Sequence, residues 1–153
     1  DILTVANQFY ERIFVDLDNN VPEEISNKII NMSDIIVINL NQRLSSIEDF
    51  KQKKEEKQKF KSAKVLLLIG RYDKYSKYNI KNITRYLGER NNILTIPYNT
   101  LFFEAAEEAG VPDLFLRFKK FMDPDDRNAF FVEEVKRASE NIIYRIQNVQ
   151  KGQ

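Results

Sequence analysis

The sequence contains no histidine, no cysteine and no tryptophan. Without histidine and cysteine, a Ser-His-Asp or Cys-His nucleophile, a disulfide framework and a zinc site of the Cys/His type are excluded. Any catalysis must use carboxylates, Lys, Arg, Tyr, hydroxyl groups or a metal ion with oxygen ligands. Glycine is also scarce, and the four glycines lie far apart at positions 70, 88, 110 and 152. The sequence therefore contains no glycine-rich loop that could cradle phosphate groups.

An excess of charge and a long apolar run are missing as well. The 24 basic and 23 acidic residues leave a net charge of +1, which predicts no general attraction to nucleic acid or to a membrane. No apolar run approaches the roughly 20 residues of a membrane span, and there is no signal-peptide pattern. Because the hydrophobic fraction of 42 % is enough for a packed core, we expect a soluble, cytoplasmic protein.

Short apolar runs alternate with helical patterns along the chain. Four runs predict β-strands: Arg12–Asp16, Ile35–Leu40, Val65–Ile69 and Ile93–Ile96. The first three runs are nearly continuous in apolar residues, as is typical of strands that are buried on both faces of a parallel sheet. Helices are predicted at residues 22–32, 45–60, 79–87 and 100–109. The alternation predicts an α/β fold, with a mostly parallel sheet of about four strands covered by helices.

A long amphipathic helix is predicted at the C-terminal end. Asp123 and Pro124 supply a capping carboxylate and a proline for the first helical turn. Apolar residues then recur at spacings of three and four, at positions 131, 135, 138, 142, 146 and 149. We interpret residues 1–149 as a single α/β domain and residues 150–153 as a frayed tail.

The first candidate functional residue is Asp16, at the end of the first predicted strand. Ligands of open parallel sheets bind at the carboxyl ends of the strands, and an acid at such a position is typical of the carboxylate that accompanies Mg²⁺ in nucleotide-binding folds. The alternative is an ordinary polar turn, in which Asp and Asn side chains form local hydrogen bonds.

Two further candidates follow the later predicted strands. Arg71, beside Tyr72, offers a flat cationic surface on which a base could stack, although a solvated loop is the alternative. Pro97 could close a ligand pocket or simply end its strand. The lysine-rich segment 51–64, with seven Lys and two Glu, is better interpreted as a solvated helix face than as a nucleic-acid site, because i,i+4 ion pairs are available within it.

Taken in order, four stretches resemble the ParA/MinD-type deviant-Walker P-loop ATPases, which include the TadZ/CpaE-like proteins of pilus assembly. Tyr10–Asn20 resembles the strand that ends in the family's Asp-x-Pro-x-Gly turn, and Ser33–Asp49 resembles its next strand and switch region. Leu66–Asp73 resembles the "VLNRYD" segment, and Ile93–Ala106 resembles the "GxIPxDxxxxxA" segment. The resemblance spans about Tyr10 to Pro112.

The resemblance implies a site for ATP and Mg²⁺ in the full-length protein. Asp16 would hold the Mg²⁺ ion through water, Arg71 and Pro97 would flank the adenine, and Asn99 would take the polar position that follows that proline. The family's phosphate-binding loop lies on an earlier strand, so we expect it before Asp1. This chain alone is therefore not expected to hydrolyse ATP.

The resemblance also implies a homodimer that forms when nucleotide binds. The switch turn and the dimer face would include Asn19, Asn20, Ser45, Ser46 and Asp49. Asn19 and Asn20 stand where the family has Pro and Gly, and an asparagine is bulkier than the glycine that lets the backbone approach the γ-phosphate.

The function implied is that of the C-terminal part of an ATPase that positions pilus, secretion, partition or division machinery. Its partner would be a protein of such a system, and recruitment to a membrane or cell pole would occur through that partner. The alternative is a non-enzymatic scaffold with a degenerate nucleotide site, which the Asn19–Asn20 turn favours. A receiver-like signalling domain is less well supported, because Ile96 leads to Pro97 rather than to a lysine.

Overall fold

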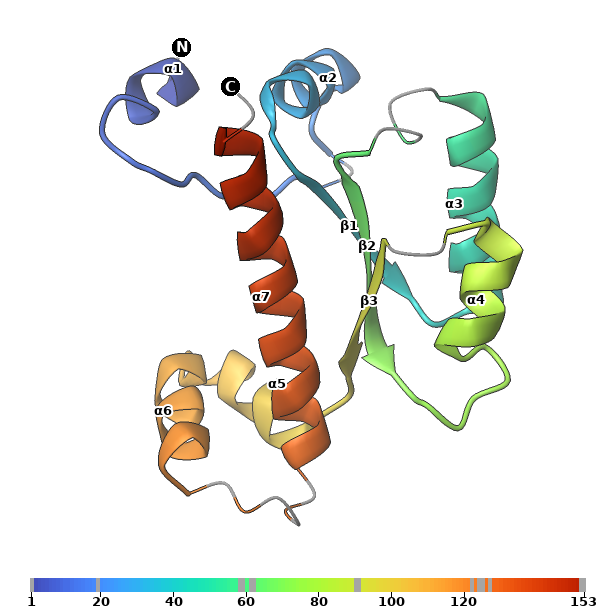
Figure 1. Cartoon of the computed structure of the whole chain (residues 1–153), viewed down its shortest axis with the longest axis vertical. Coiled ribbons are helices and arrows are strands. Elements are labelled where there is room, and N and C mark those ends of the chain that lie inside the picture. The colour runs from blue at the N-terminus through green and yellow to red at the C-terminus, as the bar shows by residue number, and fades with distance from the viewer. Residues whose placement is uncertain are drawn as a thin grey trace. The chain divides into compact units, whose positions relative to one another are not determined.

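The computed structural model describes residues 2–18, 20–57, 60, 63–89, 92–121, 123, 126 and 128–151. They fall into two compact units, Asp1–Ser33 and Asp34–Gln153. The first unit contains helices α1 (Ile2–Ala6) and α2 (Glu23–Met32). The second unit contains strands β1 (Ile36–Asn41), β2 (Val65–Tyr72) and β3 (Ile93–Pro97), and helices α3 (Leu44–Glu56), α4 (Ile80–Leu87), α5 (Thr100–Glu107), α6 (Val111–Phe121) and α7 (Ala129–Lys151) (Figure 1).

The sheet of the second unit is parallel, and its strand order β1-β2-β3 follows the sequence. Helices α3 and α4 cover one face of the sheet, and α7 covers the other (Figure 1). The central strand β2 is buried on both faces: Val65 and Leu67 pack toward α3 and α4, whereas Leu66 packs toward α7. The α/β class, the parallel sheet and the long C-terminal helix that the sequence predicts are thus confirmed.

The prediction of about four strands is wrong, because the described residues form three. Arg12–Asp16, which the sequence predicts as the first strand, is an extended segment without a strand partner. Its side chains are exposed, and Phe14 is 82 % accessible. An apolar, β-branched composition shows that a segment is suited to a sheet, but a strand also needs a neighbouring backbone with which to pair.

The helix boundaries follow the local signals in some places and not in others. Helix α4 ends at Leu87, as the sequence predicts, and Gly88 caps it with a φ of 69° in the left-handed region. Helix α6 was not predicted, because Gly110 indicates the end of the preceding helix; however, Pro112 lies in the first turn of α6, where proline is tolerated. Helix α7 begins at Ala129. Pro124 lies outside the described residues.

Helices α5, α6 and α7 meet around a cluster of phenylalanine rings. Phe115 and Phe131 each contact the other three rings of the set Phe102, Phe115, Phe118 and Phe131, with ring centroids between 5.4 and 6.4 Å apart. Phe131 is buried, whereas Phe103 is 45 % exposed. Most of the phenylalanine-rich region therefore stabilises the packing of these three helices.

Two remaining sequence predictions concern the ends of the fold. The interpretation of residues 1–149 as one domain stays a prediction. Residues 150 and 151 of the predicted tail still belong to α7, and residues 152–153 lie outside the described residues. Among the helices described, none combines the length and the apolar character that a membrane crossing requires.

Candidate functional site

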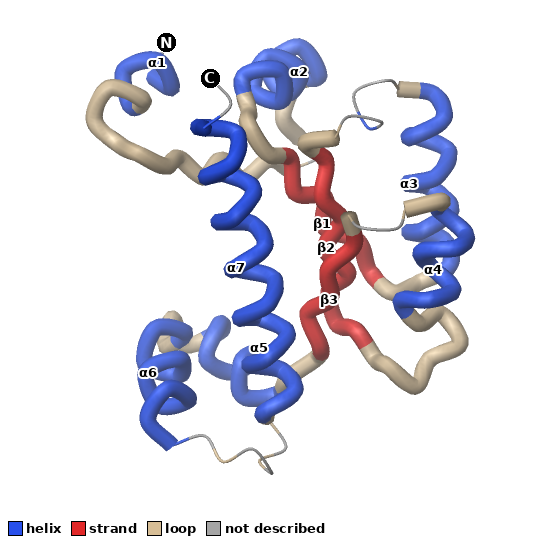
Figure 2. The backbone as a smooth tube through the Cα atoms, in the orientation of Figure 1, coloured by secondary structure: helices blue, strands red, loops and turns tan. Residues whose placement is uncertain are grey.

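The candidate site is the edge of the sheet at which the strands end. Because β1, β2 and β3 are parallel, their last residues, Asn41, Tyr72 and Pro97, lie at the same edge. Figure 2 shows the chain leaving this edge toward α3, α4 and α5. Open α/β sheets bind ligands at this edge because the loops that follow the strands can face a ligand together.

Arg71 and Pro97 lie next to each other at this edge. Gly70 pairs with Ile96 and Tyr72 pairs with Pro97, so Arg71 is an extra residue that forms a bulge in β2. Its φ of 52° lies in the left-handed region, which is unfavourable for a side chain with a Cβ atom. The bulge leaves the Arg71 side chain exposed beside the buried Pro97.

Gln42 joins the first two loops at this edge. Its side-chain carbonyl accepts a hydrogen bond from the Asp73 backbone N–H at 2.7 Å. Its Nε2 donates to the backbone carbonyls of Asp73 and Tyr78, both at 2.9 Å. One side chain from the β1–α3 loop thus holds both ends of the loop that follows Arg71. Gln42 could not be predicted from the sequence, because no local pattern indicates a contact with residues more than 30 positions away.

Asn99 has a structural role at the third loop. Its side-chain carbonyl caps α5 by accepting the Phe102 N–H at 2.9 Å, and its Nδ2 donates to Asn128 at 2.7 Å. Asn128 is buried, and Asp126 accepts its backbone and side-chain N–H groups, each at 2.7 Å. One amide hydrogen and one carbonyl lone pair of Asn99 remain for a ligand.

The predicted dimer-face residues of this unit lie on α3 beside the same edge. Ser45 and Asp49 are exposed in the first turns of the helix. The Ser46 hydroxyl accepts a hydrogen bond from the Asn41 N–H at 3.3 Å, which links the end of β1 to the start of α3. The second unit thus brings Ser45, Ser46, Arg71, Pro97 and Asn99 to the edge at which the three strands end.

Asp16 and the switch turn belong to the first unit. The prediction that Asp16 ends a strand is wrong, because Arg12–Asp16 has no strand partner, and Asp16 is exposed. Asp18 accepts hydrogen bonds from the backbone N–H and the side-chain Nδ2 of Asn20, at 2.9 and 3.0 Å. These bonds, the backbone bond first, hold the pKa of Asp18 below its usual value. Asn19 lies outside the described residues.

The residues at the sheet edge suit the base of a nucleotide better than its triphosphate. Arg71, Pro97 and the free half of the Asn99 amide suit a purine ring. A triphosphate needs a cradle of backbone N–H groups from a glycine-rich loop, and the sequence contains none. No group of three or more acids that could hold a metal ion occurs within the described ranges.

A polar network lies on the face of the sheet that α7 covers. Thr95, which is 2 % exposed in β3, donates to the carboxylate of Glu134 on α7. Arg137 donates to the same carboxylate at 2.6 Å and to the Thr95 hydroxyl at 3.3 Å. The signal in the sequence is a lone threonine in the apolar run at residues 93–96. The network ties α7 to the sheet.

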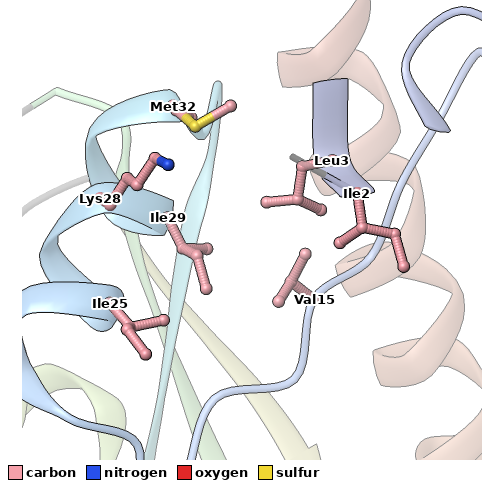
Figure 3. A pocket seen from close by; sticks show the side chains of 7 residues that line it. All are labelled: Ile2, Leu3, Val15, Ile25, Lys28, Ile29 and Met32. Carbon is pink, nitrogen blue, oxygen red and sulfur yellow. The ribbon is translucent and has the colours of Figure 1, made fainter. Parts of the chain in front are cut away.

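The first unit contains an open apolar cavity of about 600 Å³ (Figure 3). It is formed by α1, α2 and the extended segment between them, and is lined by Ile2, Leu3, Val15, Ile25, Lys28, Ile29 and Met32. None of the described residues of this unit is fully buried. The lining is aliphatic apart from Lys28, so the cavity offers an apolar surface and no pair of groups suited to acid-base catalysis.

Comparisons with protein-family models, with curated proteins and with solved structures give no match.

Proposed function

We propose that the second unit supplies the base-binding side of a nucleotide site in a ParA/MinD-like ATPase, nearest to the TadZ/CpaE type. The observation that carries the proposal is the β2 bulge at the carboxyl edge of the parallel sheet, where the unpaired Arg71 precedes Tyr72, the partner of Pro97. It is supported by the order of the four similar sequence stretches, because three of them include the carboxyl end of a strand at this edge.

The chemistry of this edge favours a planar heterocycle. The exposed Arg71 guanidinium can stack on one face of an adenine, whereas the Pro97 side chain is buried and would contact the base only after it is uncovered. Asn99 can offer one donor and one acceptor to the edge of a base without losing its cap on α5. The Gln42 contacts hold the loop after Arg71 in place before a ligand arrives, which lowers the entropic cost of binding.

The triphosphate and Mg²⁺ would be held mainly by a segment outside this sequence. In such a site Mg²⁺ neutralises charge on the phosphate oxygens, and Asp16 would accept hydrogen bonds from its water shell. The full-length protein would use nucleotide-dependent dimerisation, with Ser45, Ser46 and Asp49 near the dimer face, to position cellular machinery through a protein partner. It would act in the cytoplasm and reach a membrane or cell pole through that partner.

A second candidate function is a non-enzymatic interaction module with a degraded nucleotide site. The first unit favours this alternative, because Asp16 lies on an exposed segment that is not a strand. In addition, Asn20 occupies the turn in place of glycine and is bound to Asp18. A module of this kind would contact its partner without nucleotide.

The base-binding proposal is tested by titrating this chain with AMP and following backbone amide resonances by NMR. We expect shifts confined to residues 70–73 and 96, 98 and 99, and their loss in Arg71→Ala. Arg117→Ala is the matched control, because Arg117 is an exposed arginine on α6. Shifts that are absent, scattered over the chain or unchanged in Arg71→Ala would contradict the proposal and favour the interaction module.

A further inference from the structure

A three-residue repeat begins at the end of β2. Residues 71–79 read Arg-Tyr-Asp, Lys-Tyr-Ser, Lys-Tyr-Asn, so that each triplet contains a cation, a tyrosine and a small polar residue. We name this segment the basic tyrosine loop. It carries three cations and one acid, whereas the whole chain has a net charge of +1. The positive charge is therefore a local property of this loop.

The backbone of the basic tyrosine loop is held by hydrogen bonds at each turn. Gln42 binds Asp73 and Tyr78 at the two ends of the loop. Inside it, the Asp73 carboxylate accepts the Tyr75 N–H at 2.9 Å, and the Ser76 hydroxyl accepts the Tyr78 N–H at 3.2 Å. The small polar residue of each of the first two triplets thus fixes the loop, and the cations are left outside.

The cations of the loop are directed to solvent and to aromatic rings. No ion pair joins Arg71, Lys74 or Lys77 to any acid of the described chain. The Lys74 ammonium lies 5.2 Å from the ring centre of Tyr75 and 4.8 Å from that of Phe130 on α7. Positive charge that no carboxylate neutralises remains available to an anionic ligand.

The three tyrosines of the loop have different surroundings. Tyr72 is 6 % exposed, and its hydroxyl accepts the Ile80 N–H at 3.0 Å, so it anchors the loop. Tyr78 is half-buried beside Lys77, whose ammonium lies 5.1 Å from its ring centre. Tyr75 is 86 % exposed, so the ring face opposite the Lys74 ammonium can stack on a planar group that arrives from solvent.

We propose that the basic tyrosine loop binds single-stranded nucleic acid. Arg71, Lys74 and Lys77 would contact successive phosphates, and one base would stack on Tyr75. Single strands are bound in this way because cations follow the backbone while an aromatic ring takes the face of an unpaired base. A base inside a duplex is stacked on its neighbours and cannot offer its face to Tyr75.

An anionic membrane is a weaker match for the same loop. Recognition of anionic lipid usually takes four to eight clustered cations, and this loop has three. The single-strand proposal goes beyond the proposed nucleotide site and uses different atoms, since it depends on Tyr75, Lys74 and Lys77 in addition to Arg71. The two proposals can therefore fail separately.

The test is fluorescence anisotropy with a labelled twelve-nucleotide oligo-uridine at low salt. Tyr75→Ala is expected to weaken binding about tenfold, as is typical when one stacking ring is removed. The double variant Lys74→Gln/Lys77→Gln is expected to lower the slope of log K against log salt by about 1.4, since each phosphate contact contributes about 0.7 for a single strand. A duplex of equal length should bind more weakly than the single strand.

The controls remove side chains of the same types, a tyrosine and two lysines, from surfaces outside the basic tyrosine loop. Tyr144→Ala removes a tyrosine that is 64 % exposed on α7, and Lys119→Gln/Lys136→Gln removes two exposed lysines on α6 and α7. Both should bind like the unsubstituted chain. The proposal is overturned if the single strand does not bind, if Tyr75→Ala binds normally, or if the controls lose as much affinity as the loop variants. The AMP titration with Arg71→Ala and Arg117→Ala tests the nucleotide site independently of these results.

Discussion

The side-chain amide of Gln42 pairs with the backbone of Asp73 in both directions, accepting its N–H at 2.7 Å and donating to its carbonyl at 2.9 Å. A third bond, to the Tyr78 carbonyl, joins the same side chain to the far end of the loop. One residue after β1 therefore fixes the conformation of the loop after β2. Both proposals for this edge depend on that loop being held in place.

Replacing Gln42 by alanine should lower the free energy of unfolding by about 1–2 kcal/mol, because the backbone groups of Asp73 and Tyr78 lose their partners. Gln42→Glu should cost a similar amount, since a carboxylate cannot donate to the two carbonyls. Gln52→Ala is the matched control: Gln52 is exposed on α3 and bonds Glu56 in its own helix. Denaturant unfolding measures both variants, and equal stabilities for Gln42→Ala and Gln52→Ala would refute the role given to Gln42.

Two glycines allow backbone conformation to be tested apart from packing. A Cβ atom at Gly88 would meet nothing within 4 Å, but the φ of 69° is strained for alanine. Gly88→Ala should therefore destabilise the protein by about 1 kcal/mol. At Gly110 the nearest atom would be the Ala105 carbonyl oxygen at 3.8 Å and φ is not left-handed, so Gly110→Ala should change stability by less than about 0.5 kcal/mol. Thermal melting compares the two variants, and a larger loss of stability in Gly110→Ala than in Gly88→Ala would contradict the account of the α4 C-cap.

The contact between α7 and β3 can be tested through Glu134. Its side chain is 14 % exposed and binds both Thr95 and Arg137. Glu134→Ala should cost about 1–3 kcal/mol, because the buried Thr95 hydroxyl loses its acceptor. Glu140→Ala, which removes an exposed 3.9 Å pair with Lys136, should change stability by less than about 0.5 kcal/mol. Equal effects of the two substitutions on the denaturation midpoint would show that the network contributes nothing.

The hydrogen bonds at Asp18 lead us to expect that the stability of this turn depends on pH. The bonds from Asn20 lower the pKa of the folded Asp18 carboxyl below its unfolded value. Their contribution to the turn is therefore complete above the unfolded pKa and is lost as the pH falls through the folded pKa. NMR titration of the carboxyl carbon should show this depression, and Asn20→Ala should reverse it only in part because the backbone N–H remains. A full reversal would show that the side-chain amide, rather than the backbone, is the main cause.

Two of the apolar runs that predict strands have different outcomes, which shows what composition can predict. Val65–Ile69 becomes the centre of the sheet, because β1 and β3 pair with it on both sides and helices cover both faces. Arg12–Asp16 has three consecutive apolar residues between an arginine and an aspartate, and it remains unpaired. Composition indicates that a run suits a sheet, but not that a partner strand is present. Likewise, Gly110 indicates the end of a helix without showing that another begins at once.

Some features of the candidate site could likewise be predicted from the sequence, and others could not. That Arg71 and Pro97 lie at one edge could be predicted, because parallel strands end on the same side of a sheet. The bulge that leaves Arg71 with a φ of 52° could not be predicted, since no glycine or asparagine occupies the position. The contacts of Gln42 and Glu134 join residues far apart in sequence. Such pairs become evident only when the packing of loops and helices is known.

The most direct test of the proposed nucleotide site is the melting temperature of the full-length protein encoded in frame with these residues, measured with and without ATP and Mg²⁺. A ligand at one hundred times its Kd stabilises the folded state by about 2.7 kcal/mol, so we predict a rise of several degrees. The rise should be reduced in Arg71→Ala and retained in Arg117→Ala. No rise for the unsubstituted protein, or an equal rise for both variants, would contradict the account.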